Sequence, residues 1–328
     1  MKNLDSNTLK ETSPAGEIMA FHRGELCFHQ SWGKTYKYYD LASLTKILFT
    51  NDLLQMAIKQ KLLKLSDPVH RFLPYWHKGV KIENLLRHDA GYTWWKPFYR
   101  RLPLHAPIEL KPAYLQKLIV QEKPVKSKQA VYSDIDYFIL GFVLEKIFNM
   151  PLSYGYELLE HPFHFNVGNQ AKYNKYFYAP TEKCSWRGKR LQGEVHDQNA
   201  WALGGVAPHA GLFGSIQDMR TWFLDFRLRL KRDAILKNFC RRAMPVSRGD
   251  WALGYMMPSK GKASCGSKFS LKSIGHTGFT GTSFWYDPEV DLGVIVLSNR
   301  IYRGANHKQI RKTRPWIHDH IYERCIHV

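Results

Sequence analysis

Residues 39–46 have the sequence Y-D-L-A-S-L-T-K, which places a serine three residues before a lysine. The apolar residues that follow recur at spacings of three and four, and this pattern predicts a buried helix from about Ser43 to about residue 61. Residues i and i+3 lie on one face of a helix, so we expect Lys46 to point back at the Ser43 hydroxyl. The stretch therefore predicts a serine–lysine pair on one helical turn.

A serine and a lysine in this arrangement can carry out nucleophilic catalysis. A serine hydroxyl is a weak nucleophile until a neighbouring base accepts its proton. Lys46 can be that base because burial lowers the pKa of a lysine, and a helix N-terminus adds positive charge where an oxyanion forms. The tetrapeptide alone equally fits an N-capping serine followed by a solvated lysine, and the rest of the chain has to decide.

The length and composition are typical of a soluble globular protein. The 328 residues are enough for one large domain or two interleaved domains. No run approaches the roughly 18 to 20 apolar residues of a membrane span, and the first residues lack the apolar segment of a secretory signal. We expect a cytoplasmic protein if Met1 is the native start, and a periplasmic protein if a leader was removed.

The five cysteines are widely scattered along the chain. Their odd number and their spacing fit neither a disulfide framework nor a zinc site. We therefore expect all of them to be reduced and structural. They are Cys27, Cys184, Cys240, Cys265 and Cys325.

The formal net charge of +20 suits an anionic substrate, a polyanionic partner or an anionic environment. The basic residues are spread along the chain, with modest clusters such as residues 308–314 and with no dense tail or zinc finger. We interpret them as a solvated basic surface and do not expect nucleic acid as a partner. The oligomeric state is not predicted.

Strand patterns occur at both ends of the chain. Residues 16–22 and 25–29 predict a hairpin turned by Arg23-Gly24, and four further strands are expected at 251–256, 272–278, 283–286 and 292–297, before a closing helix at 307–325. The segment between is mostly helical, including a helix that a capping box opens at Ser215.

This order predicts an α+β fold, in which the N- and C-terminal segments form one antiparallel sheet flanked by helices, with a large and mostly helical insertion. We expect residues 1–40 and 245–328 to form the sheet domain and residues 41–244 the mainly helical domain. The active site is expected in the cleft between them.

Three further motifs follow the serine–lysine stretch. Residues 85–91 are L-L-R-H-D-A-G, residues 132–134 are Y-S-D, and residues 276–278 are H-T-G. In this order they resemble the serine β-lactamase and penicillin-binding-protein-like family, on the side of class C-like β-lactamases, DD-carboxypeptidases and esterases. The resemblance runs from about residue 14 to the C-terminus, and it is specific for fold and nucleophile but weak for substrate.

The resemblance implies roles for four residues. Ser43 would attack a carbonyl and become acylated, and Lys46 would help to remove its proton. Tyr132 would act with Lys46 as the general base and then protonate the leaving group, which requires neighbouring cations that favour its anion. The oxyanion hole would consist of the backbone N–H groups of Ser43 and Phe279.

The resemblance also implies a substrate pocket. His276 and Thr277 would line it and contact a substrate carboxylate or the leaving group. The aromatic loop at residues 92–99 either walls the pocket or forms a packed lid, and we weigh the two equally. The expected substrate-binding residues are Trp94, Trp95, Asp134, His276, Thr277 and Gly278.

Two of these residues depart from the family pattern. Asp134 stands where relatives usually carry asparagine, and an ionised carboxylate only accepts hydrogen bonds. This favours peptidase or esterase chemistry over β-lactam turnover. His276 replaces the lysine of the K-T-G motif, and we expect a weaker partner for a carboxylate unless the imidazole is protonated near neutral pH.

His88, His196 and His209, with Asp197, match no metal-binding spacing. We expect them to hold irregular loops by hydrogen bonds, and we predict neither a metal nor a cofactor.

The leading hypothesis is a serine hydrolase that forms an acyl-enzyme on an amide or ester. A D-Ala-D-Ala type peptide, including an anionic muropeptide, and a small carboxylic ester are the expected substrates, with a β-lactam third. The alternatives are a β-lactamase proper and a non-catalytic basic binding protein on the same fold, whose affinity for nucleic acid would fall steeply with salt.

Overall fold

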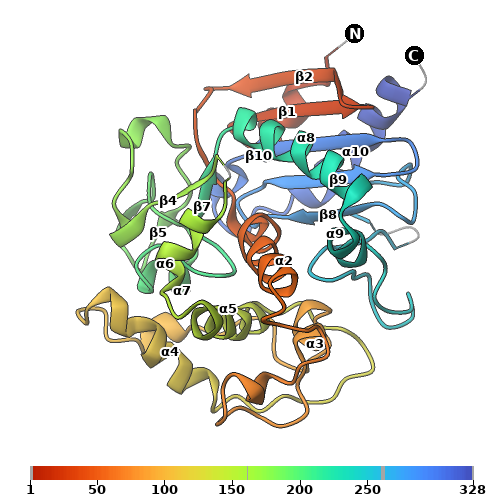
Figure 1. The fold of residues 1–328 in the computed structure, drawn as a ribbon. Helices are drawn as coiled ribbons and strands as arrows, with labels where there is room; N and C mark the ends of the chain where they lie inside the picture. The colour runs from red at the N-terminus through yellow and green to blue at the C-terminus, as the bar shows by residue number, and fades with distance from the viewer. Residues whose placement is uncertain (1–2, 161, 260–262, 327–328) are drawn as a thin grey trace.

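A five-stranded antiparallel sheet joins the two ends of the chain (Figure 1). The computed structural model describes residues 3–160, 162–259 and 263–326. The strand order is β2-β1-β10-β9-β8. The strands are β1 (Ala15–His22), β2 (Glu25–Gly33), β8 (Ile274–Thr277), β9 (Ser283–Asp287) and β10 (Leu292–Ser298).

The central strand β10 is buried along its whole length because helices cover both faces of the sheet. Its sequence, L-G-V-I-V-L-S, is a continuous apolar run of the kind that a strand covered on both sides requires. Ile295 belongs to the core that includes α8 (Ile216–Arg232). Val294 belongs to the second core, with α1 (Ser6–Thr12) and α10 (Ile310–Ile326).

The helical part packs below this sheet, with α2 (Asn51–Lys59) between the sheet and α5 (Asp134–Phe148) in Figure 1. The first eleven residues of α5 are all buried, as expected of a helix that is apolar on every side. The neighbouring helices are α3 (Ile82–Leu86), α4 (Lys111–Ile119) and α6 (Leu152–Gly155). Helices α7 (Gln198–Ala202) and α9 (Ala234–Phe239) complete this part.

A small three-stranded sheet leads the chain into the serine–lysine stretch. Strand β3 (Tyr39–Asp40) pairs with β7 (Leu212–Gly214), which also pairs with β4 (His164–Phe165). Strands β5 (Lys183–Cys184) and β6 (Lys189–Arg190) form a separate hairpin.

The α+β fold and the sheet made from both ends of the chain are confirmed. The expected strand at residues 251–256 is wrong. This segment turns back on itself at Gly254, whose φ is +79°, and forms only isolated bridges from Trp251 to Met256 and from Met256 to Gly275. The division into two domains stays a prediction.

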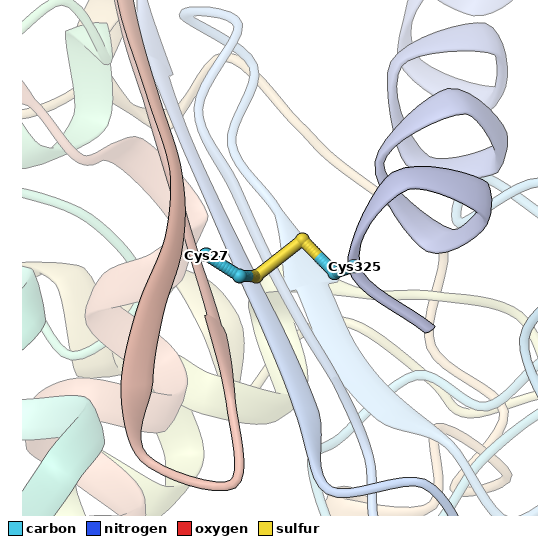
Figure 2. Close-up of a disulfide and its surroundings, with 2 residues drawn as sticks. All are labelled: Cys27 and Cys325. Atoms are coloured by element: carbon cyan, nitrogen blue, oxygen red, sulfur yellow. A yellow bond between two sulfur atoms is a disulfide. The ribbon is translucent and has the colours of Figure 1, made fainter. Parts of the chain in front are cut away.

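The expectation that every cysteine is reduced is also wrong. Cys27 on β2 and Cys325 on α10 form a disulfide, with their Cα atoms 5.7 Å apart (Figure 2). They are separated by 298 residues, and only the packing of the last helix beside the first hairpin brings them together. The other three cysteines are free thiols.

Within the described residues, no helix is both long enough and apolar enough to cross a bilayer.

Candidate active site

Ser43 lies in a short 3-10 turn, Ala42–Leu44, directly after β3. Ala42 takes a left-handed backbone conformation with φ of +48°, which costs free energy for any residue with a Cβ. Two hydrogen bonds hold it there: its N–H donates to Asp40 Oδ1 (2.8 Å), and Thr45 Oγ1 donates to its carbonyl (2.6 Å). A π-helical turn, Lys46–Thr50, then connects to α2.

Lys46 is fully buried below Ser43, and its ammonium has three acceptors. Nζ donates to Ser43 Oγ (3.1 Å), to Asp134 Oδ1 (2.7 Å) and to the His209 carbonyl (3.1 Å). Burial lowers the pKa of Lys46, and the carboxylate of Asp134 opposes that shift.

Tyr132 approaches Ser43 from the other side. Its hydroxyl donates to Ser43 Oγ (2.8 Å), and Lys46 Nζ lies 5.0 Å from the centre of its ring. Burial, followed by the negative charge of Asp134, raises the pKa of Tyr132 well above its ordinary value. The environment therefore favours the neutral phenol over the anion that a general-base role of Tyr132 requires.

Asp134 begins α5, where the positive end of the helix dipole favours a carboxylate. The preceding residue, Ser133, caps the helix, because its Oγ accepts a hydrogen bond from the Ile135 N–H (3.1 Å). This cap fixes the direction in which Asp134 leaves the backbone and enters the site.

A buried pair, His88 and Asp136, lies under Tyr132. Asp136 Oδ2 is 2.8 Å from His88 Nδ1, which also accepts the Ser133 N–H (3.2 Å). Burial raises the pKa of Asp136 and lowers the pKa of His88, so the environment favours the neutral form of each group. The His88 ring packs 4.9 Å from the Tyr132 ring.

His276 and the glycine after it form the opposite wall, at the end of β8. Burial, followed by the charge of Lys46, lowers the pKa of His276 to about 3. This shift favours the neutral imidazole, which is the form expected to be the weaker partner for a carboxylate. Nδ1 of the neutral ring donates to the Thr277 carbonyl (3.0 Å). At Gly278 an added Cβ would lie 2.0 Å from Thr282 Oγ1 and 2.8 Å from the Leu41 carbonyl, so only glycine fits beside the nucleophile turn.

The structure brings all of the expected site residues except Lys46 to the wall of one cavity of about 550 Å³, and Lys46 lies below its floor. Trp94 is 58% exposed, which fits a residue at the mouth of the cavity. The expected residues in the wall are Ser43, Trp94, Trp95, Tyr132, Asp134, His276, Thr277, Gly278 and Phe279.

Three arginines in the same wall were not expected as site residues. Arg314 on α10 is 8% exposed and donates to the carbonyl of Thr282 (3.1 Å), while Arg300 donates to the carbonyl of Phe279 (2.8 Å). No described carboxylate forms an ion pair with them or with Arg311, and Glu182 in the same wall lies 3.0 Å from His196 instead. Burial lowers the pKa of Arg314 to about 9.

The profile of the Beta-lactamase family matches residues 10–314. This chain belongs to the Beta-lactamase family. A protein of Salmonella paratyphi B named putative D-alanyl-D-alanine carboxypeptidase is 25% identical over 388 residues, covering 96% of this chain and 88% of the relative. The family and this name indicate a hydrolase of the β-lactamase and penicillin-binding-protein type.

Two solved structures with low sequence identity share the fold. The class C β-lactamase from Rhodobacter sphaeroides has a TM-score of 0.68 at 16% identity, with 97% of each chain covered. The hydrolase EstCE1, described as having promiscuous acyltransferase activity, also has a TM-score of 0.68, at 17% identity, covering 94% of this chain and 96% of its own.

In this Beta-lactamase family chain His88 and His209 form side-chain hydrogen bonds of the expected kind, whereas His196 Nε2 lies 3.0 Å from Glu182 Oε1 in an ion-pair contact. His209 Nε2 lies 2.9 Å from Asp197 Oδ1. Burial acts to raise the pKa of Asp197, but the interactions with His209 and other neighbours outweigh burial, and the pKa is lowered. One atom of a type that can bind a metal, from each of Asp134, Asp197 and His209, lies within 4.8 Å of the other two. The ammonium of Lys46 already compensates this cluster, because it donates to Asp134.

The arginines carried only a weak signal in the sequence. Arg311 and Arg314 belong to a basic cluster that a solvated helix would equally show, and nothing local indicates that the first turn of α10 faces the cavity.

Proposed function

We propose that the protein is a serine hydrolase that forms an acyl-enzyme through Ser43. The observation that carries this proposal is the position of Ser43 Oγ, 3.1 Å from Lys46 Nζ and 2.8 Å from the Tyr132 hydroxyl, at the wall of the cavity. A nucleophile within hydrogen-bond reach of side chains that can relay its proton is the arrangement that acyl transfer requires.

In the proposed reaction Ser43 Oγ attacks the carbonyl carbon of an amide or ester. The backbone N–H groups of Ser43 and Phe279, whose residues line the same cavity, are the proposed donors to the oxyanion. Tyr132, held neutral, is suited to pass a proton to the leaving group, because a phenol both donates and accepts. Water then hydrolyses the acyl-enzyme.

We propose that the preferred substrate carries a carboxylate close to the scissile bond. A buried guanidinium without a carboxylate partner is unfavourable in the free enzyme, and a substrate carboxylate would compensate it. Arg314, with Arg300 and Arg311, offers that charge beside the H-T-G segment. A peptide with a free C-terminus, as in a DD-carboxypeptidase-like reaction, has this carboxylate in the right place.

A small ester is the second candidate substrate, since an ester needs no strong proton donor at its leaving group. A β-lactam is third. The pKa of His276 favours its neutral imidazole, so among the described residues in the cavity wall we assign recognition of an anionic group to the arginines.

A non-catalytic basic binding protein remains the competing class, because the net charge is +20. Its affinity for an anionic polymer would fall steeply with salt concentration. Absent or salt-insensitive binding would remove this alternative.

The cavity draws its wall from both of the expected domains, Trp94 and Tyr132 from one and His276 and Arg314 from the other. This supports our proposal that the site lies in a cleft between them. The Cys27–Cys325 disulfide supports an oxidising compartment such as the periplasm over the cytoplasm.

The first experiment is intact-mass spectrometry after a timed incubation with penicillin, beside a Ser43→Ala control. An adduct on the wild type alone would support the nucleophile and a DD-peptidase-like enzyme. Drug loss without an adduct would indicate rapid deacylation and a β-lactamase.

If neither an adduct nor loss of the drug is observed, the proposed function is tested on other substrates. A peptide ending in D-Ala-D-Ala is compared with the same peptide carrying a C-terminal amide, and a small ester is assayed in parallel. Turnover of any of these by the Ser43→Ala variant at the wild-type rate would refute the proposal.

A further inference from the structure

The ammonium of Lys46 has no lone pair free for the Ser43 proton. Its three N–H groups have three acceptors, Asp134 Oδ1, the His209 carbonyl and Ser43 Oγ, and an ammonium has no acceptor capacity of its own. The contact with Asp134 is the shortest of the three, at 2.7 Å. Lys46 must therefore lose a proton before it can accept one.

Tyr132 does not take over this task in the resting site. Its hydroxyl donates to Ser43 Oγ, and its buried surroundings, with a carboxylate nearby, favour the neutral phenol. The remaining candidate is a carboxylate that contacts Lys46 directly.

Among the described residues, one carboxylate meets this condition. Asp136 is hydrogen-bonded to His88, and Asp197 is hydrogen-bonded to His209, so each of these carboxyl groups has its own imidazole partner. Asp134 lines the cavity and has Lys46 as its partner. The other titratable side chains around the pair are Tyr132, Tyr137, Asp136, His88, Asp197, His209 and His276.

We propose that Asp134 is a catalytic residue that accepts a proton from Lys46 and so converts it into the base for Ser43. This inference rests on the proposed serine hydrolase function. It assigns to Asp134 a role in proton transfer in place of the substrate binding expected from the sequence.

The step conserves every proton. One Nζ proton moves across 2.7 Å to Asp134 Oδ1, which leaves a neutral amine and a neutral carboxyl group. Rotation about the Cε–Nζ bond turns the freed lone pair toward Ser43 Oγ, 3.1 Å away. As Oγ bonds to the substrate carbonyl carbon, the Ser43 proton moves to Nζ and the carbonyl π electrons move to oxygen.

Collapse of the tetrahedral intermediate reverses the transfers. The leaving group departs with its bonding electrons and takes one proton from Lys46 through the Tyr132 hydroxyl, which gives its own proton and receives another. Asp134 then returns its proton to Lys46. Asparagine at this position could not take part, because its amide does not accept a proton near neutral pH.

In its reactive form the Lys46–Asp134 pair holds one titratable proton, shared between a neutral amine and a carboxylate. This count predicts how the acylation rate depends on pH. With Asp134 present, the proton can sit on either partner, so the acylation rate should be flat from about pH 6 to about pH 9. In Asp134→Asn the amine is free only after a proton leaves for solvent. Acylation should then be slower and should rise about tenfold per pH unit until the amine is deprotonated.

The test measures the release of nitrophenolate from 4-nitrophenyl acetate by stopped flow, at a wavelength insensitive to its ionisation. This leaving group needs little proton assistance, so the rate reports the first transfer. The matched control is Asp136→Asn, which also replaces a buried carboxyl group in the first turn of α5. Because burial raises the pKa of Asp136 and so favours its neutral carboxyl group, we expect the substitution to leave the shape of the pH profile unchanged.

A flat wild-type profile together with a rising limb in Asp134→Asn would support the proposal. The proposal would be overturned if the wild-type acylation rate rises with pH and the corresponding rise in Asp134→Asn occurs at lower pH. In that case Asp134 would only raise the pKa of Lys46. Equal profile shapes in the two proteins would also overturn it and leave a structural role.

If Asp134→Asn does not fold, as judged by circular dichroism, the wild-type profile decides alone: a flat profile supports the proposal and a rising one overturns it. The fate of the proposed function is read separately. Nitrophenolate release by Ser43→Ala at the wild-type rate would overturn that function, and this inference with it.

Discussion

Removal of the Cys27–Cys325 disulfide should lower the stability of the fold substantially. The disulfide closes a loop of 298 residues, so it restricts almost the whole unfolded chain. The chain-entropy relation gives a ceiling of about 6 kcal/mol for a loop of this length, and native disulfides more often contribute about 2 to 4 kcal/mol. We expect Cys27→Ser/Cys325→Ser to lose about 3 kcal/mol.

The assay is urea denaturation followed by tryptophan fluorescence, with and without reductant. With a slope of about 3 kcal/mol per molar urea, a loss of this size moves the midpoint down by about 1 M. Reductant should lower the wild-type midpoint to that of the double variant. It should leave the midpoint of the double variant unchanged, which serves as the internal control.

A thiol count makes the reasoning easy to refute. Unreduced protein, unfolded in guanidinium, should show three reactive thiols out of five cysteines. Five reactive thiols, or equal midpoints for oxidised and reduced wild type, would show that the bond does not form or does not stabilise the fold.

Three further outcomes are expected. Arg314→Gln should raise KM about 10- to 100-fold for a peptide with a free C-terminus and little for the C-terminal amide, because a charged hydrogen bond contributes about 1.5 to 3 kcal/mol; steady-state kinetics on the two peptides checks this. Gly278→Ala should abolish acylation and lower stability by about 1 to 3 kcal/mol, since the added Cβ meets Thr282 and the Leu41 carbonyl; mass spectrometry and urea denaturation measure both. His276, buried and neutral with a pKa of about 3, should contribute stability that is present above about pH 6.5 and lost as pH falls toward 3, by up to about 4 kcal/mol, because the unfolded state binds the proton more tightly. Urea midpoints from pH 7 to pH 4 should fall less steeply in His276→Gln than in the wild type, and parallel slopes would contradict this.

The features that the sequence predicted well depend on residues close together in the chain. Ser43 and Lys46 face each other because they are one helical turn apart, and the observed contact of 3.1 Å joins residues i and i+3. The hairpin at Arg23-Gly24, the capping box at Ser215 and the apolar run of β10 are equally local signals. The ordered motifs added Tyr132 and the H-T-G segment through resemblance to a family.

The tertiary structure decided the contacts that define the chemistry. Lys46 and Asp134 are 88 residues apart, and whether Asp134 faces the substrate or the lysine depends on how α5 packs against the nucleophile turn. That packing also buries Tyr132 and His276, and burial shifts the pKa of each so that its neutral form is favoured more strongly.

Long-range packing also explains why the sequence did not predict the arginines in the cavity wall or the disulfide. Arg314 enters the cavity, and Cys325 meets Cys27, only because α10 packs on the sheet beside the first hairpin. Local spacing determines which residues share a turn or a strand face. Burial and long-range pairing arise when distant segments pack together, and these set the protonation and the partners on which the function of this chain depends.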